Sequence, residues 1–62
     1  MGMLSNIVGR YHVGTPTEEV VAGVMRKVQK GVSQERREEI AQEVREIHEA
    51  NIVLYHSVMR GI

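Results

Sequence analysis

The side chains best suited to binding chemistry in this sequence are an aromatic ring and several cations in the first half of the chain. Arg10, Tyr11 and His12 are consecutive. An aromatic ring can stack on a planar base while neighbouring cations hold a phosphate, so this combination is typical of a nucleotide site. Further basic residues that could join such a site are Arg26, Lys27 and Lys30. The pattern also allows Tyr11 to pack against the helix that follows it, and both interpretations stay open.

Residue patterns for catalysis or metal binding are not found in this sequence. A zinc-protease motif would need a second histidine four residues after His48, where the chain has Ile52. His48 and His56 would lie about 12 Å apart along a helix, so one ion cannot bind both within one chain. The chain has no cysteine, and it has no glycine-rich phosphate loop. We therefore predict that the protein is not an enzyme and has neither a metal site nor a cofactor.

The net charge of the 62-residue chain is zero, but the charges are unevenly placed. Residues 1–32 carry four basic and two acidic side chains, whereas residues 33–50 carry six acidic and three basic ones. Proteins that bind duplex DNA usually have a broad basic face, so this distribution favours a small anion over nucleic acid. There is neither a signal-peptide pattern nor an apolar run of about 20 residues. We expect no membrane partner and a cytoplasmic location.

The element that dominates the chain is a predicted helix over residues 33–60, which would be about 40 Å long. Ser33 suits its N-cap, because the hydroxyl can accept a hydrogen bond from an unpaired backbone N–H. Gly61 suits a left-handed stop. The apolar seam steps by four and three residues alternately, as in a short coiled coil or a helical hairpin. The seam residues are Ile40, Val44, Ile47, Asn51, Leu54 and Val58.

A first helix is predicted over residues 16–30. Thr15, Pro16 and Glu18 form a capping-box pattern at its start, with Pro16 at the first helical position, where its missing N–H costs nothing. Gly23 lies in the interior of this helix, where glycine is about 1 kcal/mol worse than alanine. Its presence indicates either a tolerated weakness or the close approach of another backbone or a ligand.

The remaining segments complete the predicted fold. Residues 1–14 are expected to form an extended, bent arm, because Gly9 and Gly14 weaken a regular strand. The turn at residues 31–32 is so short that the two helices should be antiparallel neighbours. The sequence therefore predicts an all-α fold, in which residues 1–62 form one helical-hairpin domain with an extended N-terminal arm.

The end of the second helix is the reason to expect self-association. The first helix can cover the second only to about residue 48, which leaves residues 49–62 as an overhang. Residues 52–55 are four consecutive apolar side chains, and at about 100° per residue they surround the helix. One hairpin cannot bury all of them. We therefore predict a homo-oligomeric helical bundle, in which the polar seam residue Asn51 fixes the register.

The order of these features resembles a family of phage immune-evasion proteins. These are the anti-CBASS cyclic-nucleotide sponges, whose helical hairpin also occurs in anti-Thoeris sponges. The residues that carry the resemblance are Tyr11, His12, Pro16, Glu18, Glu19, Arg26, Glu49, Ala50 and Asn51. The resemblance implies a small hairpin that assembles into a higher oligomer, typically a hexamer, and binds cyclic di- and trinucleotides without cleaving them. It also implies that Tyr11 stacks on a base and that Arg26 holds a phosphate.

Three functional hypotheses follow from the sequence. The first is a phage sponge in the host cytoplasm that sequesters cyclic oligonucleotide second messengers and so antagonises CBASS-type defence signalling. In this hypothesis the arms of two hairpins close over one ligand, and Lys27 or Lys30 assists Arg26. The second is a structural or adaptor hairpin that presents its acidic face to a protein partner. The third is a ribbon-helix-helix DNA-binding regulator, with Arg10 and His12 on a strand in the major groove.

Overall fold

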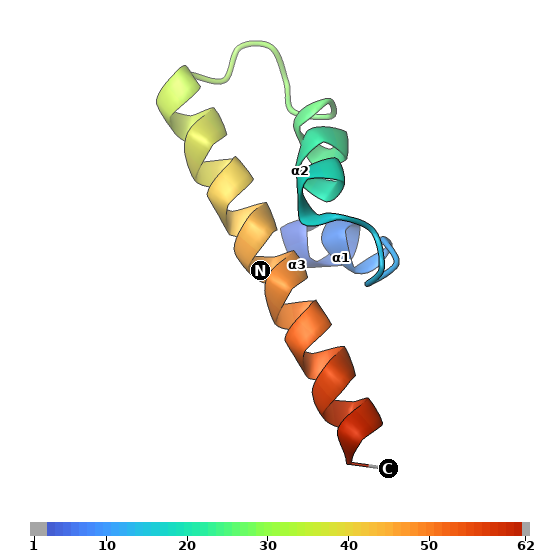
Figure 1. Cartoon of the computed structure of the whole chain (residues 1–62). Coiled ribbons are helices and arrows are strands. Elements are labelled where there is room, and N and C mark those ends of the chain that lie inside the picture. The colour runs from blue at the N-terminus through green and yellow to red at the C-terminus, as the bar shows by residue number, and fades with distance from the viewer. Residues whose placement is uncertain (1–2, 62) are drawn as a thin grey trace.

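The computed structural model describes residues 3–61 and contains three helices and no strand within that range (Figure 1). The helices are α1 (Met3–Gly9), α2 (Thr17–Met25) and α3 (Gln34–Arg60). The all-α class predicted from the sequence is therefore confirmed. α1 and α2 both pack against α3, whose C-terminal end, coloured red, projects beyond them (Figure 1). None of these three helices is long and apolar enough to cross a membrane.

A small cluster of valines from all three helices forms the buried core. Its members are Val8, Val20, Val21, Val24 and Val44. The three α2 valines are spaced by one and three residues, so they make one face of that helix apolar. Val8 of α1 and Val44 of α3 are fully buried in the same cluster. The molecule is elongated, with extents of 46 × 21 × 16 Å, because this core lies against only part of the long α3.

The predicted extended arm over residues 1–14 is wrong for its first half, because Met3–Gly9 forms helix α1. Leu4, Ile7 and Val8 recur at helical spacing and pack in the valine cluster. This burial outweighs the poor helix propensity of the glycine, which is the last residue of α1. A ribbon-helix-helix fold needs a strand at this place, so that hypothesis loses its structural basis. Residues 1 and 2 of the predicted arm lie outside the described residues.

Helix α2 is shorter than the predicted range 16–30, since it ends at Met25. The predicted capping box is also wrong: Pro16 occupies the N-cap position, and no side chain caps the helix there. Arg37 of α3 lies against the end of α2. Its guanidinium donates long hydrogen bonds of 3.5 Å to the carbonyl oxygens of Met25 and Gln29. A cation that serves the last carbonyls of a helix stabilises its termination.

Helix α3 begins and ends where the sequence predicts. Ser33 is its N-cap, and the side-chain oxygen accepts a hydrogen bond from the backbone N–H of Arg36 at 3.2 Å. The helix continues without interruption to Arg60. Gly61 follows with a φ of −78°, so the predicted left-handed stop is wrong. Its N–H instead donates to two carbonyls of the last helical turn, which any residue at this position could do.

The C-terminal part of α3 is apolar and largely uncovered in a single chain. Val53, Leu54 and Val58 are 68%, 63% and 57% exposed. Tyr55 and Met59 are exposed beside them. Contiguous apolar surface of this kind is rare on a monomeric protein and usually marks a contact with another molecule. We refer to these five residues as the α3 apolar patch.

Candidate functional site

An open pocket of about 330 Å³ lies beside α2 and contains two of the predicted ligand residues. Its lining residues are Tyr11, Thr15, Glu19, Ala22, Gly23 and Arg26. Four of these come from α2 and the residue after it, and their spacing by three, one and three places them on one helical face. The other two come from the connection between α1 and α2. The fold thus places Tyr11 and Arg26 in one pocket, although they are fifteen residues apart in the sequence.

Tyr11 has two contacts that explain its position in this pocket. Its ring is half-buried and packs against the valine cluster. Its hydroxyl lies over Gly23, where an added Cβ would collide with it and would also lie 3.3 Å from the ring carbon Cζ. Gly23 therefore reflects a close approach, as the sequence allowed, but the approaching group is a side chain of the same molecule. Tyr11 packs on α2 and lines the pocket at the same time.

The other four predicted ligand residues do not line this pocket. His12 is exposed, and its Nδ1 accepts a hydrogen bond from the backbone N–H of Gly14 at 2.8 Å, so it closes the turn before α2. Lys27 lies beside a different depression, formed with α1 and the start of α3. Arg10 and Lys30 are exposed. Within one chain, this pocket is thus lined by two of the six predicted ligand residues, Tyr11 and Arg26.

A test of the Tyr11 position is available at Gly23. A Gly23→Ala variant should be less stable than the parent by about 1 kcal/mol, because the strain of overpacking exceeds the benefit of alanine in a helix. In a Tyr11→Phe background the colliding hydroxyl is absent, and the same substitution should lose most of its penalty. Thermal unfolding of the four chains by circular dichroism, at one protein concentration, measures this coupling. A gain of about 1 kcal/mol in both backgrounds would contradict the contact.

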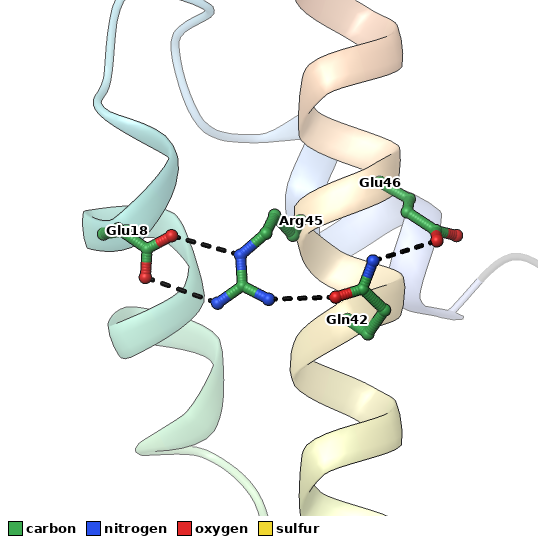
Figure 2. A network of polar contacts seen from close by, with 4 residues as sticks. All are labelled: Glu18, Gln42, Arg45 and Glu46. Carbon is green, nitrogen blue, oxygen red and sulfur yellow. Dashed lines mark hydrogen bonds and ion pairs between the residues drawn. The ribbon is translucent and has the colours of Figure 1, made fainter.

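An ion pair fixes the start of α2 against the middle of α3 (Figure 2). Arg45 donates from Nε and Nη2 to the two carboxylate oxygens of Glu18, at 3.1 and 3.4 Å. The hydrogen bond, and then the attraction of the charges, holds the pKa of Glu18 below its ordinary value and the pKa of Arg45 above its own. Gln42 accepts from Arg45 and donates to Glu46, which extends the network along α3 (Figure 2).

This ion pair contributes to stability only while Glu18 is ionised. Because the pKa of Glu18 is lowered in the folded chain, the contribution is present above the unfolded pKa and is lost as the pH falls through the folded pKa. Glu18 is exposed, so water and salt screen the pair and keep the contribution small. The pair also reflects how α2 is oriented. Glu18 points toward α3, and the next residue, Glu19, faces the pocket.

His48 is the one buried polar side chain among residues 3–61, and it holds the loop that carries the pocket. Its Nε2 lies 2.8 Å from the carbonyl oxygen of Thr15. A carbonyl only accepts, so Nε2 carries the hydrogen in this bond. The other ring nitrogen, Nδ1, is buried and has no hydrogen-bond partner in the described part of the chain. α3 is thus tied to the α1–α2 connection next to Tyr11.

Sequence reasoning missed two residues of this region. Glu19 is one of the pocket residues, and its spacing of four and seven residues from Gly23 and Arg26 was a usable signal for one helical face. His48 had a weaker signal. It follows Val44 by one helical turn, but the seam predicted from the alternation of four and three residues runs through Ile47 instead. Only the contact with Thr15, far away in the sequence, identifies its role.

Comparison of the chain with protein-family models, with curated proteins and with solved structures gives no match. The site must therefore be judged on its own geometry. No group of three or more His, Cys, Asp or Glu side chains that could hold a metal ion occurs within residues 3–61. The pocket is lined by an aromatic ring, a guanidinium group and a carboxylate, together with Gly23, which the Tyr11 hydroxyl covers. These groups can stack, hold an anion and accept hydrogen bonds.

Proposed function

We propose that this protein binds cyclic di- and trinucleotide second messengers and sequesters them without cleaving them. As a phage protein in the host cytoplasm, it would thereby antagonise CBASS-type defence signalling. The observation that carries the proposal is the shared pocket of Tyr11 and Arg26. These two residues are the ones to which the sequence resemblance assigns base stacking and phosphate binding. Sequestration needs affinity alone, so the function requires no catalytic group.

The two side chains suit these roles. Tyr11 has one part of its ring seated on the valine cluster, so little conformational freedom remains to be lost when a base stacks on it. Such stacking is worth about 1–3 kcal/mol per base. Arg26 is exposed at the end of α2, and its guanidinium makes no hydrogen bond or ion pair with any other described residue. A phosphate would receive charge-assisted, bidentate hydrogen bonds from it.

Self-association is part of the proposal. A cyclic dinucleotide has two bases and two phosphates, whereas one pocket offers one tyrosine and one arginine. Two hairpins that each contribute Tyr11 and Arg26 would match the ligand. In this proposal the hairpin consists of α2 and the first half of α3, which are in contact through Glu18 with Arg45 and through Met25 with Arg37. The α3 apolar patch supplies the surface through which hairpins would assemble, up to the hexamer that the resemblance implies.

Calorimetric titration with a panel of cyclic di- and trinucleotides tests the proposal. We expect at least one of them to bind, and Tyr11→Ala and Arg26→Ala each to weaken binding about tenfold or more. Arg36→Ala removes an exposed arginine outside the pocket and should leave affinity unchanged. Circular dichroism spectra should confirm that all three variants are folded.

Two results would count against sequestration. If no member of the panel produced heat, the binding function itself would have to be abandoned. If a ligand bound but mass spectrometry of the heat-released small molecules found linear products, the protein would be a hydrolase. Intact ligand recovered from the purified protein would support the sponge.

An adaptor function is the second candidate, and one surface feature favours it. Acidic side chains and Gln42 lie together on one open face of α3. They are Glu35, Glu38, Glu39 and Glu43. A basic segment of a partner protein would complement this face. Capture of a defined basic peptide by the unaltered chain, in the absence of any nucleotide binding, would favour the adaptor over the sponge.

A further inference from the structure

We propose that the base held by this pocket is guanine and that Glu19 selects it. This inference rests on the proposed function and names the ligand class more narrowly. The base stacking and phosphate binding proposed above use Tyr11 and Arg26. They leave Glu19 without a role, although its carboxylate is on the wall of a pocket that is otherwise suited to an anion. Glu19 is exposed and lies in the first turn of α2, where the helix dipole favours a carboxylate. Because a carboxylate repels phosphate, the part of a bound nucleotide that could pair with Glu19 is a base edge with hydrogen-bond donors.

The positions of the charged groups define what such a ligand must look like. Glu19 and Arg26 are seven residues apart on one face, which corresponds to about 10 Å along the helix axis. Gly23 lies between them, and the Tyr11 hydroxyl lies over it. The ligand must therefore present hydrogen-bond donors at one end, a flat surface toward Tyr11 in the middle, and an anion at the other end. A nucleotide has this layout, with its base edge and its phosphate at opposite ends.

Glu19 is available for this purpose, whereas its neighbour Glu18 is not. Glu18 binds Arg45 through both carboxylate oxygens. Glu19 is exposed and makes no side-chain hydrogen bond or ion pair with any residue from 3 to 61. The two carboxylates are adjacent in the sequence but point to different surfaces, because successive helical residues are rotated by about 100°. One joins the helices, and the other lines the pocket.

The chemistry of the base edges decides in favour of guanine. An ionised carboxylate is an acceptor only, with two oxygens side by side. The Watson–Crick edge of guanine presents two adjacent donors, the N1–H and the N2 amino group, and both oxygens can be satisfied at once. Adenine presents one amino donor next to the N1 lone pair, which would face the second oxygen of Glu19 without a hydrogen. Unstacked bases are commonly read on this edge.

The test compares cyclic di-GMP, cyclic di-AMP and the mixed cyclic GMP-AMP by calorimetry. For the unaltered chain we expect cyclic di-GMP to bind about tenfold or more tightly than cyclic di-AMP, the scale of one good bidentate base contact. The amide of Glu19→Gln can accept at one position only. This variant should lose most of the difference through weaker binding of cyclic di-GMP. Glu18→Gln is the matched control and should keep the guanine preference.

The outcomes separate this inference from the function on which it rests. Equal affinity of the unaltered chain for cyclic di-GMP and cyclic di-AMP would overturn the role of Glu19 and leave sequestration intact. Unchanged cyclic di-GMP affinity in Glu19→Gln would do the same. If no cyclic dinucleotide or trinucleotide bound to the unaltered chain, both the inference and the proposed function would fall.

Discussion

If the chain assembles through the α3 apolar patch, as proposed, a Leu54→Glu, Val58→Glu double variant is expected to be monomeric at concentrations at which the unaltered chain is oligomeric. Both side chains belong to the α3 apolar patch, and they are one helical turn apart on the same face. Burying a leucine or valine contributes about 1.5–3 kcal/mol, and burying a carboxylate in its place costs more. The dissociation constant should rise at least about 100-fold, because each subunit carries both changes. Light scattering coupled to size-exclusion chromatography measures the mass.

A matched control tests whether added negative charge alone changes the measured mass. Gln34→Glu adds negative charge at the exposed start of α3, far from the patch, and should leave the mass unchanged. If two chains share one cyclic dinucleotide, the monomeric double variant should also bind that ligand more weakly, although Tyr11 and Arg26 are intact. A monomeric mass for the unaltered chain at micromolar concentration would contradict the proposed assembly. It would also contradict a binding site formed by two chains.

Helix α3 was predictable in its extent because its signals are local. A serine N-cap and a run of residues without Gly or Pro both lie within the helix or next to it. The end of α2 was not predictable in this way. Its contacts are not local, since Arg37 of α3 donates to the carbonyls of Met25, the last residue of α2, and of Gln29 in the connection. The α1 helix was missed because Gly9 and Gly14 indicated a bent, extended arm, whereas burial of Leu4, Ile7 and Val8 favours the helix.

The candidate site was predictable in part for a similar reason. Tyr11 and Arg26 were chosen by residue type, and the fold places them in one pocket through the helical face that Gly23 shares with Arg26. Lys27 has the same charge and is adjacent in the sequence, but one step of about 100° turns it toward α1 and another depression. Residue type therefore suggested the chemistry, whereas the fold determines which of the two neighbouring cations, Arg26 or Lys27, lines the pocket with Tyr11.

A His48→Ala variant is expected to lose about 2–4 kcal/mol of unfolding free energy. The ring is fully buried, so its removal leaves a cavity beside the valine cluster, and the carbonyl of Thr15 loses its donor. For a chain of this length the total stability is only about 3–9 kcal/mol, so the variant should melt at a clearly lower temperature than the unaltered chain. Thermal and urea unfolding, followed by circular dichroism, give the difference.

The control for this result is the exposed histidine on the same helix, which shows what the loss of an unburied ring does to stability. His56→Ala should change stability by less than about 0.5 kcal/mol, since His56 lies on the uncovered part of α3. His48→Gln should fall between the two, because its amide can still donate to the Thr15 carbonyl. Thr15 also lines the pocket beside Tyr11, so cyclic-nucleotide affinity should decrease in the same order as stability. Equal stability of the His48→Ala and His56→Ala variants would show that the buried ring does not hold the loop in place.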